Sequence, residues 1–453
     1  MGSTAIVLAA GKGVRMKSKT PKILHAAAGR PLIDHVISGL KSAGFDEIRV
    51  VIGHGGDQVK KHLESYSSLT LFTQTQQLGT ADAVKSAQLN SLKGTVLICN
   101  GDHPLISSSD YKKALHTFTQ SGCDLMVVTA RVKNPAGFGR ILRRREGGID
   151  SIVEEKDADD VQRKIREVNS GLYVVKAEVL KKFLPQIENK NAKKEYYLTD
   201  IIQLALKAGA PVETCTLPPR VCRGVNNQLE LALASRSLYR RKALELLDAG
   251  VTIIDPAATY IESDVKVGSG TVIHPGCMIT GKTVIGSDCV VEGHCQIRSS
   301  RIGDGVEIRW GTLIDESEVS NGAVVGPYAR LRPESVIGES AHIGNFVEIK
   351  KTRVGARAKA NHLAYLGDAE IGEDTNIGCG TITCNYAVNH KKYKTKIGKR
   401  VFVGSDSQFV APVTIGDDAV IGSGSTITKD VPEKALAVAR ARQFVKPDYN
   451  KEK

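Results

Sequence analysis

The sequence is poor in aromatic residues. Of its 453 residues, 9 are Phe, 12 are Tyr and 1 is Trp, whereas 44 are Gly. Apolar residues contribute 41% and charged residues 25%, which is ordinary for a folded protein. At roughly 100 to 200 residues per domain, this length predicts about two to four domains. We therefore expect a multidomain chain in which at least one part is rich in tight turns.

Long apolar segments and paired cysteines are also missing. No run of about 18 apolar residues could cross a bilayer, and no cleavable leader precedes the strand-like residues 4–9. We therefore expect a cytoplasmic protein without membrane insertion. Its cysteines lack metal-ligand spacing and would be reduced in that compartment, so neither disulfides nor zinc are predicted. They are scattered singly at Cys99, Cys123, Cys215, Cys222, Cys277, Cys289, Cys295, Cys379 and Cys384.

The net charge of +13 favours anionic partners such as nucleotides, sugar phosphates, coenzyme A, nucleic acid or acidic lipid. A nucleic-acid platform would need a basic stripe interleaved with aromatic residues, and the sequence has none. Small phosphate ligands and solvated surface charge are therefore the favoured interpretation, and no nucleic-acid partner is expected.

Residues 1–225 alternate between apolar, β-branched runs and helical stretches. The strand-like runs are 4–9, 47–52, 95–99 and 124–129, and the helical stretches include 31–43 and 81–92. This order predicts a mostly parallel, Rossmann-like sheet covered on both faces, with ligands at the carboxyl ends of its strands. Residues 226–250 then indicate a connecting helix, which Asn226 and Asn227 can cap and Gly250 can end.

Beyond residue 250 an aliphatic residue recurs at every sixth position, often followed by Gly, which permits a turn. A hexapeptide repeat of this length is typical of a parallel β-helix, in which one aliphatic side chain per short strand stacks inward. The series, with two five-residue steps, is Ile261, Val267, Ile273, Ile279, Ile285, Val291, Ile297, Ile302, Ile308, Ile314, Val319, Val325, Leu331, Ile337, Ile343 and Ile349, and a last register holds Ile397, Val403, Phe409, Ile415, Ile421 and Ile427.

The repeat is interrupted between Thr383 and Ile397. A solenoid accommodates an insertion only as a loop that leaves one face, and such loops often carry function. We therefore expect functional residues near this loop. A purely structural scaffold is the alternative interpretation of the solenoid.

The first strand-like run leads into LAAGKGVRM at residues 8–16, and Pro21-Lys22 follows. Small residues let backbone N–H groups approach phosphate oxygens, while Lys12, Arg15 and Lys22 supply positive charge. The segment lacks the Lys-Ser/Thr of a Walker loop and the third Gly of the dinucleotide fingerprint. A phosphate-binding loop of another class is therefore predicted.

Together these motifs resemble the sugar-phosphate nucleotidyltransferase superfamily. With the hexapeptide half, the chain resembles the bifunctional N-acetylglucosamine-1-phosphate uridyltransferase and glucosamine-1-phosphate acetyltransferase family over essentially its whole length. The motifs are QLGTA at 77–81, GDHPL at 101–105, GFGRI at 137–141, IVEEKDA at 152–158, VNSG at 168–171, EYYLTD at 195–200, GVNN at 224–227, RLRP at 330–333, GNFVEIKK at 344–351, NHLAYLGD at 361–368, NIGCGTITCNY at 376–386 and VFVGSD at 401–406.

The resemblance implies a nucleotidyltransferase domain at 1–225, a linker helix at 226–250 and a left-handed parallel β-helix at 251–453. It implies acetylation of glucosamine-1-phosphate from acetyl-CoA, followed by uridylyl transfer from UTP to give UDP-N-acetylglucosamine. It also implies a homotrimer in which the acetyl-transfer site lies between subunits. A monofunctional nucleotidyltransferase with a regulatory β-helix and a non-catalytic assembly subunit are the two alternatives.

The resemblance also assigns a nucleotide site. Lys22 and Arg15 would act on the phosphates, and Asp102 and Asn226 would hold Mg²⁺. Alternatively, Asp102 is an ordinary turn residue, Asn226 is a helix cap, and Lys22 is solvated. The uridine and sugar pocket would be lined by Leu8, Ala9, Ala10, Gly11, Gln74, Gly79, Thr80, Asn100, Gly101, Asp102, Gly139, Glu154, Asn169 and Asn226.

Three positions depart from the family's common pattern. Val14 stands where Thr is usual, Ala81 where Gly is frequent, and Asn100 where Tyr precedes Gly-Asp. We expect the first two to alter loop packing alone. Asn100 removes an aromatic face beside the ligand.

For the acetyl-transfer half, the resemblance identifies His362 as the base that removes a proton from the sugar amine. A structural histidine is the alternative interpretation. The amino-sugar phosphate would contact Arg332, Lys350, Tyr365 and Asn376. Acetyl-CoA would contact Asn385, Tyr386, Lys392, Ser405, Ser423 and Arg440, with Lys391 as the alternative to Lys392 because the loop is one residue longer than usual.

Overall fold

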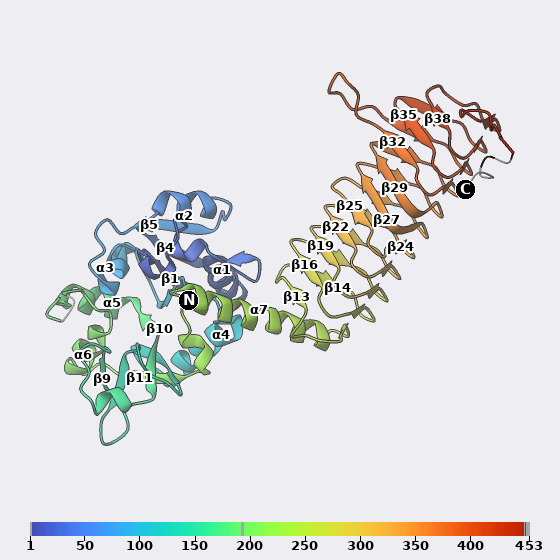
Figure 1. Cartoon of the computed structure of the whole chain (residues 1–453). Helices are drawn as coiled ribbons and strands as arrows, with labels where there is room; N and C mark the ends of the chain where they lie inside the picture. The colour runs from blue at the N-terminus through green and yellow to red at the C-terminus, as the bar shows by residue number, and fades with distance from the viewer. Residues whose placement is uncertain (1, 192–193, 448, 450–453) are drawn as a thin grey trace. The chain divides into compact units, whose positions relative to one another are not determined.

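The computed structural model describes residues 2–191, 194–447 and 449, and it forms two compact units. The first unit comprises Met1–Leu238 and the second Tyr239–Lys453 (Figure 1). The boundary falls within the helix α7 (Gln228–Asp248), which lies inside the segment 226–250 expected to be helical. Among the described residues, no helix is both long and apolar enough to span a bilayer.

The first unit is built on a mixed sheet with the order β11-β7-β10-β6-β1-β4-β5. The four predicted strands are confirmed, with small shifts at their ends, as β1 (Ser3–Ala9), β4 (Glu47–Ile52), β6 (Thr95–Asn100) and β7 (Leu125–Arg131). These strands and β5 (Leu69–Thr73) and β11 (Val212–Thr216) pair in parallel. The sheet is therefore mostly parallel, as expected.

The strand β10 (Glu167–Lys176), which the sequence did not predict, lies between β6 and β7 and is antiparallel to both. It also pairs with β8 (Arg140–Arg143), which pairs with β9 (Ile149–Val153). Because β10 carries Asn169 and Gly171 at its start, it brings the VNSG motif beside the carboxyl end of β6.

Helices cover both faces of this sheet. Alternate residues of β1 point to opposite sides, since Val7 packs with α1 (Leu32–Ala43), α2 (Gly56–Leu63) and α4 (Ser108–Ser121). Ile6 packs with α3 (Thr80–Lys85), α5 (Ala177–Phe183) and α6 (Asp200–Lys207). The single helix predicted for 81–92 is wrong. The α3 helix ends at Lys85, and Gln88 adopts a left-handed φ of 55° before a 3-10 turn, Leu89–Ser91.

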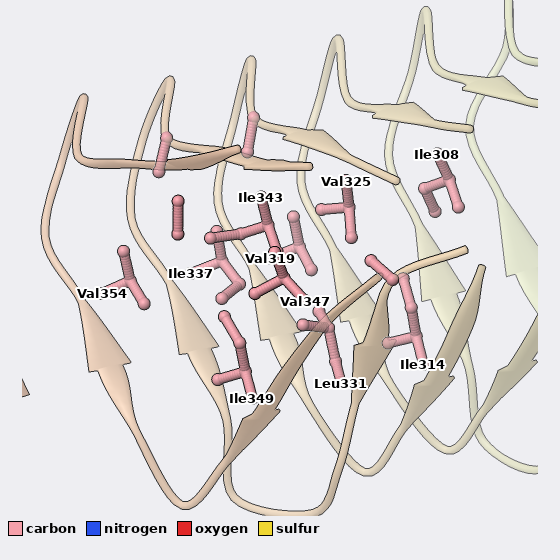
Figure 2. Close-up of a cluster of buried hydrophobic side chains, with 14 of the residues drawn as sticks. Ile308, Ile314, Val319, Val325, Leu331, Ile337, Ile343, Val347, Ile349 and Val354 are labelled. Atoms are coloured by element: carbon pink, nitrogen blue, oxygen red, sulfur yellow. The ribbon is translucent and has the colours of Figure 1, made fainter. Parts of the chain in front are cut away.

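The second unit is a parallel β-helix of short strands, from β12 (Thr252–Ile253) to β39 (Leu436–Ala437). Equivalent positions of successive coils lie 17 or 18 residues apart, as in Asp315 with Arg298 and Asp418 with Arg400. The predicted aliphatic series fills the interior, and Figure 2 shows Ile308 to Ile349 pointing inward from successive strands. This confirms the hexapeptide solenoid and agrees with the left-handed coil expected of such repeats.

A second buried column lies two residues before each aliphatic residue and holds small side chains. Thr271 Oγ1 donates to the carbonyl of Gly286 at 2.9 Å, and the thiol of Cys277 donates to the carbonyl of Glu292 at 3.1 Å. Cys289 and Cys295 occupy the same column and contact backbone carbonyls in the same way. These three cysteines therefore act as small buried residues of the repeat.

The interruption of the repeat forms a hairpin between β32 (Ile382–Cys384) and β33 (Thr395–Ile397). An antiparallel bridge joins Tyr386 to Lys392 within it. The coil that contains the hairpin spans 26 residues from Thr375 to Val401, instead of 17 or 18. The insertion thus leaves one face of the solenoid without disturbing the stack, as the projecting loop near β32 in Figure 1 shows.

Candidate functional sites

The first unit contains a cavity of about 1180 Å³ at the carboxyl ends of β1 and β6. Such a volume is large enough for a nucleotide together with a sugar phosphate. The predicted residues that line it are Leu8, Ala9, Ala10, Gly11, Arg15, Lys22, Gln74, Gly79, Thr80, Asn100, Asp102, Gly139, Glu154, Asn169 and Asn226. Gly101 lies behind this lining and donates its N–H to the carbonyl of Leu8 at 2.9 Å.

Two of the quoted motifs form one wall of the cavity together. The N–H of Tyr196 donates to Leu78 at 2.7 Å, and the N–H of Leu198 donates to Thr80 Oγ1 at 2.9 Å. Gly79 has a φ of 127°, and a Cβ there would lie 2.5 Å from the carbonyl oxygen of Tyr196. The glycine of QLGTA is therefore required by close backbone packing as well as by its torsion angle.

Polar side chains of the cavity are held in fixed orientations. Gln74 Nε2 donates to the carbonyl of Gly79 at 3.2 Å and to Asp82 at 2.7 Å, so its carbonyl oxygen is left to accept from a ligand. Asn169 Nδ2 donates to Tyr173 Oη at 2.7 Å, and the N–H of Gly171 donates to Asn169 Oδ1 at 3.0 Å. These polar groups are thus preorganised.

The ammonium group of Lys22 lies between Asp102 and Asn226. It donates to the Asp102 carboxylate, and its distance to Asn226 Oδ1 is 3.3 Å. Burial opposes ionisation of Asp102, but Lys22 and the neighbouring His103 outweigh it and hold the pKa of Asp102 below its ordinary value. An ionised carboxylate and an amide oxygen that converge on one cation are the donors that Mg²⁺ prefers. The residues present therefore fit a divalent metal.

Asn226 is not the cap of α7. Asn227 Oδ1 accepts from the N–H of Glu230 at 2.9 Å, which is the bond expected of the N-cap residue directly before Gln228. The interpretation of Asn226 as a helix cap is therefore wrong. Its side-chain oxygen faces Lys22 in the cavity.

One backbone hydrogen bond and one side-chain contact fix the segment that carries Asn226 against the strand end that carries Asp102. The N–H of Val225 donates to the carbonyl of Asp102 at 2.9 Å, and His103 Nδ1 lies 3.0 Å from the carbonyl of Val221. A Cβ on Gly224 would lie 2.7 Å from His103 Nε2, so this segment passes directly over the imidazole.

The three departures from the family pattern have different surroundings. Val14 is 78% exposed and Ala81 is fully buried. Asn100 lines the cavity, and its side-chain amide lies against Gly171. A Cβ on Gly171 would be only 2.5 Å from Asn100 Nδ2. Asn100 thus presents an amide to the cavity at the position where the family commonly has a Tyr.

Sequence reasoning missed Gln77 and Thr199, which also line the cavity. Both lie inside motifs that the sequence analysis quoted, QLGTA and EYYLTD. Their place in these motifs was the available signal: Gly79 and Thr80 were selected from the segment that holds Gln77, whereas no residue was selected from the segment that holds Thr199.

In the second unit, His362 lies on β29 (Lys359–Gly367) beside Asn345 of β27 (His342–Lys350). His362 Nδ1 is 3.2 Å from Asn345 Oδ1. With the amide oxygen of Asn345 as the acceptor, the hydrogen is assigned to Nδ1 and the lone pair to Nε2. Asn345, which the sequence analysis did not select, thus orients His362.

A polar cluster on the next part of β29 joins several predicted residues. Asn385 Nδ2 donates to Asp368 and lies 3.4 Å from Tyr365 Oη, and Lys350 Nζ lies 3.4 Å from Asp368. Lys392 reaches back to Lys350, and this contact lowers the pKa of Lys392. Two neighbouring ammonium groups are typical of a site for an anion.

Three other predicted residues of this half lie apart from this cluster. Arg332 pairs with Glu348 at 2.9 Å, whereas Asn376 is in register with Lys359 and Phe402 and is not brought beside Tyr365. Tyr386 Oη contacts His390 at 2.8 Å within the hairpin.

Ser405, Ser423 and Arg440 lie on later coils. The N–H of Gly424 donates to the backbone carbonyl of Ser405 at 2.8 Å. A Cβ on Gly424 would lie 3.8 Å from the side chain of Arg440. The N–H of Asp406 donates to Cys379, and the N–H of Gly380 donates to Leu363. Successive coils thus place His362, Cys379, Ser405 and Ser423 along one edge of the solenoid.

An α/β unit with a large polar cavity, joined to a hexapeptide solenoid, defines a two-domain transferase. The model for the MobA-like NTP transferase domain matches residues 5–168, and that for the GMPPB C-terminal domain matches 261–354. The bacterial transferase hexapeptide model, with six repeats, matches 394–429.

The relatives cover nearly the whole chain. The bifunctional protein GlmU of Bdellovibrio bacteriovorus is 56% identical over 447 residues, which is 99% of this chain and 97% of the relative. GlmU of Trichlorobacter lovleyi is 46% identical over 451 residues, which is 99% of this chain and 98% of that protein. The chain therefore belongs to the GlmU family of bifunctional proteins. It has uridyltransferase and acetyltransferase activities, and its nucleotidyltransferase half is metal-dependent.

Proposed function

We propose that the chain acetylates glucosamine-1-phosphate from acetyl-CoA in residues 251–453 and then transfers uridylyl from UTP to the product in residues 1–225. Residues 226–250 connect the two parts. The convergence of Lys22, Asp102 and Asn226 inside a nucleotide-sized cavity is the observation that carries the proposal. The alternatives of a monofunctional enzyme and a non-catalytic subunit do not agree with membership of a bifunctional family.

In the uridylyl step, an oxygen of the sugar 1-phosphate attacks the α-phosphorus of UTP, and pyrophosphate leaves. The nucleophile is largely ionised near neutral pH, since the second pKa of a phosphate ester is about 6, so no general base is needed. Mg²⁺ held by Asp102 and Asn226 would neutralise phosphate charge. Arg15 and Lys22 contribute positive charge from the protein side, and the cavity wall around Gly79 and Thr80 holds the nucleotide.

In the acetyl step, the sugar amine attacks the thioester carbonyl while His362 Nε2 accepts its proton. The thiolate of coenzyme A leaves and takes up a proton. Asn345 holds the imidazole with Nε2 free for this transfer. The edge from His362 through Ser405 and Ser423 to Arg440 supports an extended acetyl-CoA, with its thioester at His362.

We propose that Lys392 contacts acetyl-CoA, with Lys391 as the alternative. Lys391 is held differently, with its N–H donating to Asn389 at 3.0 Å. Tyr386 and Asn385 stay assigned to acetyl-CoA.

We propose that the solenoid assembles as a homotrimer and that the enzyme is cytoplasmic. A strip of exposed apolar side chains at one corner supports assembly: Tyr328 and Phe346 stack at 5.8 Å, and Leu363 follows them, each more than half exposed. All three adopt positive φ values, where other coils have Gly276, Gly311 or Gly380. Bulky residues at such positions cost free energy, which contact with a second copy would offset.

Assembly also accounts for Asn376, which lies apart from Tyr365 within one chain and would complete the amino-sugar site across a subunit boundary. A fragment of residues 1–250 is expected to be monomeric and to transfer uridylyl to N-acetylglucosamine-1-phosphate. Residues 251–453 are expected to form trimers that acetylate. A full-length monomer that acetylates, detected by light scattering, would contradict this model.

The two-step function is tested with the purified chain, glucosamine-1-phosphate, acetyl-CoA and UTP. Each co-substrate is added alone and then both together, and thiol and pyrophosphate release are followed separately. Acetyl-CoA alone should release thiol, UTP alone should release almost no pyrophosphate, and both should give UDP-N-acetylglucosamine. Rapid pyrophosphate release without acetyl-CoA would contradict the proposed order.

A further inference from the structure

The side chain of Asn226 is held from behind by Glu230. Glu230 Oε2 accepts from the backbone N–H of Asn226 at 2.6 Å and from its side-chain Nδ2 at 3.1 Å. The other carboxylate oxygen, Oε1, accepts from Asn227 Nδ2 at 3.0 Å. One carboxylate thus receives three N–H bonds on the segment that carries a proposed metal ligand.

These bonds decide which end of the Asn226 amide faces the cavity. A carboxylate can only accept, so the NH₂ group must turn toward Glu230, and the oxygen must turn toward Lys22 and Asp102. Without Glu230, the amide could rotate by half a turn and present its NH₂ group, which cannot bind a cation. The bond to a carboxylate also polarises the amide and makes its oxygen a better ligand.

Helix capping does not explain this arrangement. In a capping box, the acidic side chain returns to the backbone N–H of the N-cap residue, which here is Asn227. Glu230 reaches one residue further and bonds both the backbone and the side chain of Asn226. It also lines the cavity beside Leu233 and Ala234.

We propose that Glu230 is a positioning residue for uridylyl transfer, which orients Asn226 so that its oxygen faces the bound metal. This inference rests on the proposed assignment of Mg²⁺ to Asp102 and Asn226. Groups that orient metal ligands typically change metal affinity or activity by about 10- to 100-fold when they are removed.

The test compares Glu230→Ala, Glu230→Gln and Asn227→Ala in the full-length enzyme. Glu230→Ala should raise the KM for Mg²⁺ in uridylyl transfer by about 10- to 100-fold, with kcat at saturating Mg²⁺ largely kept. Glu230→Gln keeps an oxygen that can accept both Asn226 bonds and should restore most of the affinity. Asn227→Ala removes the cap and the bond to Glu230 Oε1 but leaves both bonds from Asn226 to Oε2, so it should lower the melting temperature and leave the KM for Mg²⁺ nearly unchanged.

Mn²⁺ binding provides a readout that does not depend on activity. Electron paramagnetic resonance titration of each variant with Mn²⁺, at saturating UDP-N-acetylglucosamine, should show weaker binding for Glu230→Ala alone. Acetyl transfer by the same samples verifies folding. If Glu230→Ala binds Mn²⁺ like the parent, or if Asn227→Ala loses the same affinity, Glu230 is a capping residue and the inference is overturned.

Should Glu230→Ala fail to fold, Glu230→Gln decides: Mn²⁺ affinity near that of the parent supports the inference, and a loss of tenfold or more overturns it. A parent enzyme that transfers uridylyl at full rate in EDTA would instead contradict the metal assignment itself. The two failures are therefore distinguishable.

Discussion

Replacement of Lys22 by Met should affect metal binding and catalysis in opposite directions. In the structure, the Lys22 ammonium group occupies the space between Asp102 and Asn226, and both Lys22 and Asp102 are only 15% exposed. A divalent metal that binds to the enzyme without nucleotide must therefore displace this cation. Met has a similar length and fills the space without a charge.

The expected size follows from the contact that the metal must break. A hydrogen bond to a charged group contributes about 1.5–3 kcal/mol, and each 1.4 kcal/mol corresponds to about tenfold in a binding constant. Lys22→Met should therefore tighten Mn²⁺ binding to the nucleotide-free enzyme by about 10- to 100-fold. Uridylyl transfer should fall by about 10²- to 10³-fold, because a cation facing the phosphates is lost.

The assay is an electron paramagnetic resonance titration with Mn²⁺ in the absence of nucleotide, paired with pyrophosphate release. Lys19→Met is the matched control, since Lys19 is exposed on the same loop and its loss removes the same charge. Lys19→Met should bind Mn²⁺ like the parent. Unchanged or weaker Mn²⁺ binding by Lys22→Met would refute the competition between lysine and metal.

Three further outcomes are expected. Asp102→Ala should abolish pyrophosphate release and leave acetyl transfer near normal, because the carboxylate serves one site only; matched pyrophosphate release would contradict its role. His362→Ala should lower acetyl transfer by about 10²- to 10⁴-fold, with partial recovery at higher pH, while uridylyl transfer to pre-acetylated substrate survives. Burial opposes ionisation of Glu167, but the bond from Arg143 prevails and lowers the pKa of Glu167 in the folded state. The pair therefore stabilises the fold above the unfolded pKa of about 4.3, and this stabilisation is lost as the pH falls through the lower folded pKa. The melting temperature of Glu167→Gln should accordingly lie below that of the parent at pH 7, and the difference should shrink toward pH 4; a constant difference would contradict the linkage.

Regular patterns in the sequence predicted the parts of the fold in which one period dominates. Most inward positions of the solenoid were predicted, because a spacing of six residues, with an occasional step of five, fixes them; Val354, Leu366 and Ile377 are also buried there and were not predicted. The strand β4 was predicted to the residue, since Ile48, Val50, Val51 and Ile52 make it rich in apolar β-branched side chains. The strand β10 was missed because its first half, with Asn169, Ser170 and Gly171, lacks the apolar alternation of a strand.

Site residues that lie in sequence motifs could be predicted. Site residues whose role depends on contacts between distant parts of the chain could not. Asp102, Lys22 and Asn226 were selected from separate motifs, but only the folded chain shows that they converge. Asn345 and His362 lie 17 residues apart, which is one coil, so they stack as neighbours although neither motif points to the other. Glu230 was missed because its role depends on the direction of a side-chain bond that composition does not reveal.

Each coil of the solenoid hydrogen-bonds only to the coils directly before and after it, which makes the second unit a linear array. Its stability is a sum of contributions from single coils and from their interfaces, so a local defect weakens one junction and not the whole rod. Truncation of a buried aliphatic side chain such as Ile279 costs about 2–5 kcal/mol, and this loss would be felt at the first coils. His362 and Ser405 lie several coils further along the chain. Fraying of the first coils should thus spare acetyl transfer, whereas the same defect at Ile421 would unravel the edge on which acetyl-CoA is proposed to lie.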